Sequence, residues 1–512
     1  MRSKPLAVAL LCLLVACQSG VQRGAFVPVD AQQTAQADPR TCERRDNDTI
    51  AKLEACIKRP WLMRHLAVFA QIAQEHPGSQ GHPNRDTGTP GYLASVAYVA
   101  GLMRSAGYNV TVQEYIYTKD AVIGMPELAT ANRNYALERD WFVARRSAAG
   151  TVTAPAEPVR GSPGGCVPSD FAGFARGHIA IVQRSSTCDY DTQVENAETA
   201  GAAAVILYDS ENGPAEARLV DAASIPVIGL VSGEVAANLL QAFRAGHAPT
   251  VRIRVETRRK RGVDYNVIAD SPYGDPNRTV VVEGHLDAIY GEGMLDNASG
   301  STTILQVALD LAKTPTRNRL RYIWFGGEEL GLLGSRYYTT HLTPAELEQI
   351  AYDIDADVTA TPNFDVLVAD PGHATKVKRF PKNVVPQSQI GNAYFTEFFK
   401  AGGVISRFAN FGNDGTDSFS FSLVGVPNTG ILTQQDCCKH AWETKLWGGV
   451  LGNYEGKIPS FNGGCVDFPH RWCDDLDNND PFVFELASKA VAYVTFKLAN
   501  RPHLPRRSHG GD

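Results

Sequence analysis

The second half of the chain contains a strand–helix–strand unit, and this unit restricts the possible folds more than any other feature of the sequence. An apolar run at 279–282 has the character of a strand, residues 299–313 have helical periodicity, and 320–325 is a second apolar strand. Two strands joined by a helix in this way run parallel in one sheet with a right-handed crossover. The sequence therefore predicts an α/β fold with a mostly parallel, doubly wound sheet.

A similar pattern precedes this unit. Apolar residues recur at helical spacing over 93–103, Gly107 follows where a helix would end, and 109–117 alternates like a strand. The strand pattern resumes at 265–269. Because 512 residues exceed what one core usually supports, we expect more than one unit. The predicted organisation is a sheet domain formed by 46–120 and 260–500, interrupted by an inserted domain at 121–259.

The predicted insert is itself small and α/β in character. Residues 177–182, 203–208 and 225–230 are predicted strands, and 194–200 and 234–243 are predicted helices. The stretch 120–165 is expected to be irregular. The basic run 252–261 is interpreted as a strand followed by a solvated linker. The formal net charge of −6 is spread over the whole chain, so we expect no nucleic-acid partner. The oligomeric state is not specified by the sequence.

The first residues are typical of an export signal. Arg2 and Lys4 precede an apolar stretch at 6–16 that is too short to span a bilayer. It ends in Leu-Val-Ala-Cys, which resembles a bacterial lipobox in which Cys17 becomes lipidated; ordinary cleavage after a small residue is the alternative. We expect a signal at 1–17, a flexible tether at 18–45 and a polar tail at 501–512. The chain is then exported and lipid-anchored, or otherwise periplasmic or secreted.

The cysteine count agrees with export. Of ten cysteines, eight remain after Cys12 and Cys17 in the signal, and an even number in an exported chain favours disulfides. Zinc binding by these cysteines is the alternative, but the paired CxxC spacing of a tetrathiolate site is absent. Closeness along the chain favours the pairs Cys42 with Cys56, Cys166 with Cys188, Cys465 with Cys473, and the adjacent Cys437 with Cys438.

Side chains able to bind metals follow the predicted strands directly. His285 and Asp287 come after the first strand, two residues apart and therefore on one side of an extended segment. Asp296 precedes the small residues that begin the helix, and Glu328 and Glu329 follow the second strand. Ligands of open α/β sheets bind at the carboxyl ends of the strands. We therefore expect these residues to form a site.

The two adjacent glutamates make a cation at this site a specific expectation. Like charges buried side by side are unfavourable unless a cation neutralises them. Bound zinc would hold one carboxylate as a ligand and leave the other to take a proton from water. Asp287 would orient the imidazole of His285, as carboxylates commonly do behind metal ligands.

These motifs resemble the bacterial co-catalytic di-zinc aminopeptidases of the leucyl type, including those with an inserted protease-associated domain. The resemblance covers about 62–498 and implies a zinc-dependent exopeptidase fold of the phosphorylase/hydrolase type. The stretches that carry it are Thr89-Pro90-Gly91-Tyr92 with Ala94-Ser95, His285-Leu286-Asp287, Asp296-Asn297-Ala298-Ser299-Gly300, Glu328-Glu329-Leu330-Gly331, Asp357 with Pro362-Asn363, and Trp447-Gly448-Gly449. Within the insert, Gly165-Cys166, Gln183-Arg184, Cys188 and Ile225-Pro226-Val227 match the protease-associated pattern, which implies a non-catalytic role.

The resemblance also implies roles for single residues. Two Zn²⁺ ions are held by His285, Asp296, Glu329, Asp357 and His470. Asp296 bridges both ions, Asp287 lies behind the ligands, and Glu328 is the general base.

Two of these assignments have alternatives. Asp353 and Asp355 compete with Asp357, which is preferred because the family's aspartate precedes a triplet matched by 361–363. His440 competes with His470, which lies in a stretch, 468–474, similar to a family loop closed by a disulfide.

Asp417 resembles the aspartate of a family segment near the substrate entrance, although Ser418 replaces the following histidine. We expect a turn or supporting role for Asp417 rather than ligation.

The expected activity is removal of N-terminal residues from peptides with a free N-terminus, by a hydroxide held between two zinc ions. A related zinc carboxypeptidase or glutaminyl cyclase on the same fold is one alternative. A non-catalytic binding ectodomain is another, against which the full ligand set argues.

Overall fold

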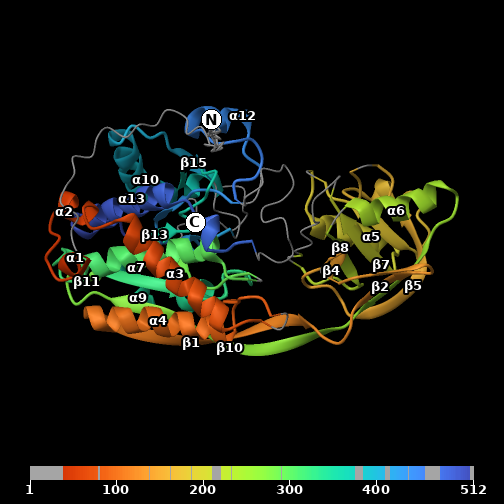
Figure 1. Ribbon diagram of the computed structural model, residues 1–512, viewed down its shortest axis with the longest axis horizontal. Helices are drawn as coiled ribbons and strands as arrows, with labels where there is room; N and C mark the ends of the chain where they lie inside the picture. Colours follow the sequence, from red (N-terminus) through yellow and green to blue (C-terminus); the bar gives the residue numbers. More distant parts are fainter. Residues whose placement is uncertain are drawn as a thin grey trace, which may run out of the picture.

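The computed structural model describes residues 39–507 except 79–80, 138, 162, 186, 210–218, 220, 232, 290, 375–383, 410–414, 436–437 and 456–472. Within this part of the chain the strands form two eight-stranded sheets. Figure 1 shows two bodies joined by the long ribbon of β1 and β10, with the larger body built from both ends of the chain. The predicted α/β fold class is confirmed.

The larger body contains a mixed sheet with a parallel centre. Its strands β12, β11, β13 and β16 are parallel neighbours, whereas β10 pairs antiparallel with β12, and β14 antiparallel with β16. In spatial order the strands are β1 (Asn109–Val122), β10 (Thr257–Asp270), β12 (Asn318–Phe325), β11 (Asp275–His285), β13 (Ile350–Ala356), β16 (Asn428–Leu432), β14 (Leu367–Ala369) and β15 (Arg407–Ala409).

Helices cover both faces of this sheet. Alternate residues of a strand point to opposite faces, and Val280 and Val282 of β11 belong to one hydrophobic cluster while Val281 belongs to another. The first cluster includes residues of α3 (Arg59–Glu75), α4 (Pro90–Ala106), α7 (Gly300–Leu311), α10 (Val384–Ala401) and α13 (Pro481–Ala499). The opposite face is covered by α8 (Leu333–His341), α9 (Pro344–Glu348) and α11 (Ser418–Leu423).

The chain reverses direction across the sheet at β11. It passes from β11 through α7 to β12 on one side, and then through α8 and α9 to β13 on the other side of β11. The carboxyl end of β11 is therefore a topological switch point, where ligands of open α/β sheets bind. His285 is the last residue of β11.

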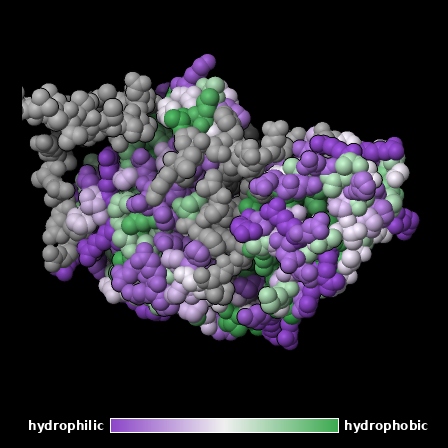
Figure 2. Space-filling model, turned by 45° about the vertical axis from the view of Figure 1, so that its right-hand side comes forward, coloured by the Kyte–Doolittle hydropathy of each residue, from purple (hydrophilic) through white to green (hydrophobic). Residues whose placement is uncertain are grey.

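The smaller body corresponds to the predicted insert. Its sheet buries apolar residues on both faces, in two separate clusters. In Figure 2 hydrophilic residues cover much of its visible surface. Its strands, in spatial order, are β3 (Arg133–Tyr135), β2 (Glu127–Thr130), β9 (Thr250–Val255), β5 (Gly150–Pro158), β6 (Ile179–Gln183), β7 (Ala204–Tyr208), β8 (Val227–Leu230) and β4 (Trp141–Val143), accompanied by α5 (Tyr190–Ala200) and α6 (Gly233–Arg244).

Two predictions for this region are wrong. The stretch 120–165 is not irregular, because it contains β2, β3, β4 and β5. Three of these strands have three or four residues, too few to show a periodicity in the sequence. The basic residues 258–261 are not a linker, because they lie in β10 and pair with β1. Their charged side chains remain exposed while the backbone is hydrogen-bonded in the ribbon.

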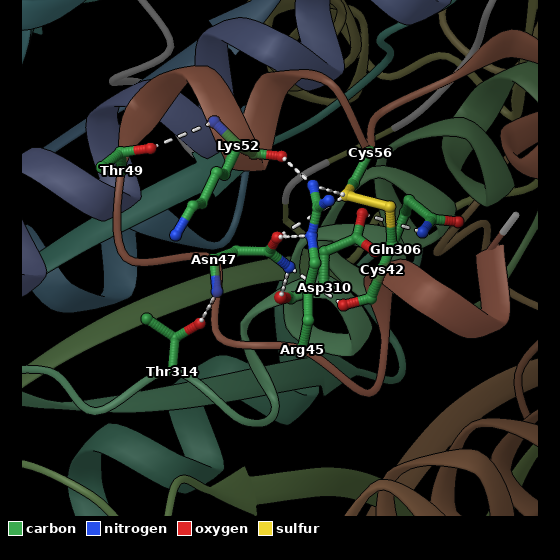
Figure 3. The surroundings of a disulfide bond; sticks show 9 residues. All are labelled: Cys42, Arg45, Asn47, Thr49, Lys52, Cys56, Gln306, Asp310 and Thr314. Carbon is green, nitrogen blue, oxygen red and sulfur yellow. Dashed lines mark hydrogen bonds between the residues drawn. A yellow bond between two sulfur atoms is a disulfide. The ribbon is translucent and has the colours of Figure 1, made fainter. Parts of the chain in front are cut away.

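A disulfide between Cys42 and Cys56 closes the N-terminal segment that contains α1 (Pro39–Cys42) and α2 (Ile50–Glu54). Figure 3 shows how this segment contacts α7: Asn47 Nδ2 donates to the main-chain oxygen of Asp310 at 2.6 Å. Cys166 and Cys188 also form a disulfide, so both of these expected pairs are present.

Cys438 and Cys473 each take part in a disulfide as well. Their expected partners, Cys437 and Cys465, lie outside the described residues, as do Cys17 and His470. Among the helices of the described part, none is long and apolar enough to cross a membrane.

Candidate metal centre

Three buried side chains meet at the carboxyl end of β11. His285 Nε2 lies 3.1 Å from Asp296 Oδ1 and 3.4 Å from Asp357 Oδ1, and one ligand atom of each residue lies within 4.8 Å of the others. The opposite ring nitrogen, Nδ1, lies 3.1 Å from the main-chain oxygen of Asp287. When Nδ1–H donates to that carbonyl, the Nε2 lone pair faces the two carboxylates and is available to a metal.

Sheet register explains why His285 and Asp357 are neighbours. Strands β11 and β13 are parallel, with Glu283 opposite Asp355. Two residues further along, His285 and Asp357 lie on the same face of adjacent strands, which are about 4.8 Å apart in any sheet. Asp296 lies in the segment Met294–Ser299 that leads from β11 into α7, and its own backbone is non-helical, with φ −111° and ψ 97°.

The main chain around Asp296 is held by two polar side chains. The buried Asp474 carboxylate accepts hydrogen bonds from the amides of Leu295 at 2.6 Å and Asp296 at 3.0 Å. Asn297 donates to the Ala356 carbonyl at 3.0 Å, next to Asp357. The first contact joins the Asp296 main chain to Asp474, and the second fixes it relative to the end of β13.

Asp287 connects this cluster to the loop that follows β12. Its Oδ1 accepts a hydrogen bond from the Glu328 amide at 3.2 Å. Its Oδ2 accepts from Thr87 Oγ1 at 2.7 Å and from the Glu329 amide at 3.4 Å. The Asp287 carboxylate lies 3.5 Å from His285 Nδ1. One buried side chain therefore fixes both the imidazole and the main chain of the two glutamates.

The buried carboxyl groups of the centre favour the binding of a cation. Burial raises the pKa of Glu328 well above its usual value, and Glu329, Asp417 and Asp357 raise it further, while His285 opposes them. Burial lowers the pKa of His285, but Asp357 and Glu328 reverse this effect and bring it well above its usual value. A cation among these groups would stabilise the ionised carboxylates. An imidazole nitrogen with carboxylate oxygens is a donor set that zinc prefers.

Further acids lie beneath the centre. Glu283, Asp353 and Asp417 are buried, and neither carboxylate oxygen of Glu283 has a hydrogen-bond donor among the described residues. Burial raises the pKa of each. Asp355 differs, because it accepts a hydrogen bond from Thr416 Oγ1 at 2.7 Å, and burial raises its pKa to about 7.

Only some of the predicted ligands lie within the three-residue group. His285, Asp296 and Asp357 come together, whereas the alternatives Asp353 and Asp355 are not in the group. Glu329 is also outside the three-residue group, although its amide is bonded to Asp287.

The remaining candidates have other surroundings. His440 is exposed at the start of α12 (Ala441–Trp447). Asp417 is buried directly before α11. A second group of possible ligands in the described part, Cys42, Cys56 and Asp310, is no metal site because its two sulfurs are bonded to each other.

Sequence reasoning missed several supporting residues. Thr87 lies two residues before the recognised Thr89-Pro90 helix start, but nothing in the sequence relates it to Asp287, 200 positions away. Arg85 is fully buried and donates to the main-chain oxygens of Leu286, Glu292 and Gly293 at 2.7 to 2.8 Å. The burial of Arg85 is visible only in the structure, so the sequence offered no signal for it.

Comparison with known proteins finds relatives for both bodies of the structure. The model of "Peptidase family M28" matches residues 266–495, and that of the "PA domain" matches 149–239. A Pseudomonas aeruginosa (strain UCBPP-PA14) protein named "Aminopeptidase" is 31% identical over 473 residues, covering 87% of this chain and 82% of that protein. "Probable lipoprotein aminopeptidase LpqL" of Mycobacterium tuberculosis is 29% identical over 443 residues, covering 85% of this chain and 83% of that protein.

Solved structures share the fold. The aminopeptidase from Aneurinibacillus sp. strain AM-1 superposes with a TM-score of 0.64 at 20% identity, covering 90% of this chain and 99% of that one. BSAP, a zinc aminopeptidase from Bacillus subtilis, gives a TM-score of 0.63 at 22% identity, covering 87% of this chain and 96% of that one.

Proposed function

The chain belongs to peptidase family M28 and contains a PA domain, and from this premise we propose that it is a zinc-dependent exopeptidase that removes N-terminal amino acids from peptides. The observation that carries the proposal is the convergence of His285, Asp296 and Asp357. The glutamate pair of the next strand end is tied to the same centre through Asp287.

The ligand set divides between two zinc ions. His285, Asp296 and Asp357 form one position, because their donor atoms are mutually close. Glu329 and His470, with Asp296 as the shared ligand, are assigned to the second position. The position of Asp474 favours His470 over His440. The Asp474 carboxylate accepts a hydrogen bond from the Asp296 amide, and His470 is four residues away in the chain, a separation of at most roughly 14 Å. His440 is exposed and outside the group.

When bound, the two zinc ions supply Lewis-acid polarisation of the scissile carbonyl and acidify water. Glu328 accepts the proton of the attacking water and delivers it to the leaving amine. Burial and the neighbouring carboxylates raise its pKa, which is the direction that makes a carboxyl group an effective proton donor. Asp287 holds the Glu328 main chain through the amide hydrogen bond at 3.2 Å.

The charge of the site favours an N-terminal over a C-terminal specificity. A free α-amine is cationic, and a cation bound in this site would favour the ionised form of a nearby buried carboxyl group with a raised pKa, such as Asp417. A carboxypeptidase would need a cationic side chain for the terminal carboxylate. The guanidinium of Arg85 donates to three carbonyls instead. Peptides with a free N-terminus are the proposed substrates.

Location and domain limits are part of the proposal. We propose an export signal at 1–17 with Cys17 as the lipidation site, and therefore an enzyme outside the cytoplasm on a lipid anchor. The similarity to a relative named as a lipoprotein aminopeptidase supports this proposal. The insert at 121–259 interrupts a peptidase domain formed by 46–120 and 260–500.

The experiment is hydrolysis of aminoacyl-anilides by the wild type and Glu328→Gln, with and without a chelator, and with N-blocked substrates. Wild-type protein should cleave only free N-termini and lose activity with chelator. Glu328→Gln should retain zinc but lose several orders of magnitude in kcat. Glu348→Gln, at an exposed residue paired with Arg507, is the matched control. Cleavage of N-blocked substrates, or a kcat of Glu328→Gln near that of the wild type, would refute the proposal.

A further inference from the structure

A turn of the inserted domain, residues 144–147 between β4 and β5, is fixed firmly to the sheet of that domain. The Ala144 amide donates to Val227 O at 3.0 Å, and the Ala148 amide donates to Ile225 O at 3.3 Å. Within the turn the main-chain oxygen of Arg146 accepts from Ala223 N at 3.0 Å. The backbone on both sides of Arg145 is therefore part of the insert's hydrogen-bonded framework.

The side chain of Arg145 leaves the insert and contacts the peptidase domain. Its Nη1 donates to the main-chain oxygen of Glu329 at 3.4 Å, and its Nη2 donates to the main-chain oxygen of Leu330. Arg145 is half-buried. The two acceptors are consecutive peptide carbonyls directly after Glu328, so a single guanidinium contacts the loop that carries both functional glutamates.

This loop is held from its other side by Asp287. The Asp287 carboxylate accepts from the amides of Glu328 and Glu329, whereas Arg145 donates to the carbonyls of Glu329 and Leu330. The loop also has tight internal geometry, because Gly331 N donates to Glu328 O at 2.7 Å and the φ of Gly331 is 102°. Its main chain is therefore fixed between one group of the peptidase domain and one group of the insert.

We propose that Arg145 is a positioning residue through which the inserted domain fixes the Glu328–Glu329 loop in its working geometry. The inference rests on the proposed roles of Glu328 as base and Glu329 as ligand. The planar guanidinium presents two donors in a rigid fork, which suits two adjacent carbonyls, whereas a lysine would present a single flexible ammonium. The insert thereby contributes to catalysis by the peptidase domain without touching the substrate.

The test compares Arg145→Met, Arg145→Lys and the matched control Arg146→Met. Arg146 lies in the same turn, and its side chain makes no hydrogen bond with another described residue. The first readout is kcat and KM on an aminoacyl-anilide with zinc-loaded protein. Arg145→Met should lower kcat by ~10- to 100-fold with a smaller change in KM, because a small displacement of catalytic groups has effects of this size. The kcat of Arg145→Lys should lie between those of Arg145→Met and the wild type, and the kcat of Arg146→Met should equal that of the wild type.

The second readout does not need activity. Amide hydrogen exchange of metal-free protein should be faster over 327–333 in Arg145→Met than in the wild type and Arg146→Met, at an unchanged melting temperature. If Arg145→Met and Arg146→Met show the same exchange rate over 327–333 and the same kcat, the inference is overturned. If the wild type fails to cleave any aminoacyl-anilide, the proposed function fails, while the exchange comparison still decides the role of Arg145.

Discussion

Asp287→Asn is the substitution that tests how the centre is held together. The change preserves the shape of the side chain but replaces one carboxylate oxygen by an NH₂ group, which cannot accept a hydrogen bond. If the NH₂ group replaces Oδ1, the Glu328 amide loses its acceptor; if it replaces Oδ2, the Glu329 amide loses its acceptor. Either rotamer therefore leaves one main-chain N–H of the Glu328–Glu329 loop without its acceptor.

The loss of one acceptor sets the size of the expected effect. A buried N–H left without an acceptor costs ~1–3 kcal/mol. If the loop pays this cost in its working geometry, kcat falls roughly 5- to 150-fold. The assay is steady-state hydrolysis of an aminoacyl-anilide, with zinc content measured on the same samples. Asp48→Asn, at an exposed aspartate paired with Lys52, is the matched control and should behave like the wild type. A kcat of Asp287→Asn within twofold of the wild type, at full zinc content, would refute the reasoning.

Two further substitutions probe the support of the centre and of the fold. Asp474→Asn removes an acceptor from the amide of either Leu295 or Asp296, so we expect ~1–3 kcal/mol lower unfolding free energy and ~10-fold weaker zinc affinity in chelator competition; unchanged affinity would contradict this role. Burial raises the pKa of Asp310 from 3.8 to about 8, so the folded state keeps a proton that the unfolded state releases. Stability should therefore fall between these pH values by up to ~1.4 kcal/mol per pH unit. Asp310→Asn cannot ionise, so its urea midpoint should rise relative to that of the wild type as the pH increases from 5 to 9. A difference in midpoint that does not change with pH would count against the raised pKa.

Local patterns in the sequence predicted the elements that position the site. The strands β11 and β12 and the helix α7 lie where apolar periodicity placed them, because each is long and buried. His285 and Asp357 were recognisable as candidates because residues that follow parallel strands meet at one edge of the sheet. Register then selects Asp357 over Asp355, which is information that exists only once β11 and β13 are paired.

The residues that hold the site could not be found in this way. Thr87, Asp474 and Arg145 act on groups that are 178 to 200 positions distant in the chain, and such contacts leave no periodic signature. The strand pairing of the basic residues 258–261 was missed for a related reason. Their charge indicated solvent exposure correctly, but exposure of side chains says nothing about hydrogen bonding of the backbone.

The most direct test of the central claim is an anomalous diffraction measurement at the zinc absorption edge on crystals of zinc-loaded protein. Two peaks are predicted, one bounded by His285, Asp296 and Asp357, and the other by Asp296, Glu329 and His470. A map without a peak beside His285 Nε2, or with one peak only at full zinc loading, would contradict the assignment of five protein ligands to two zinc ions.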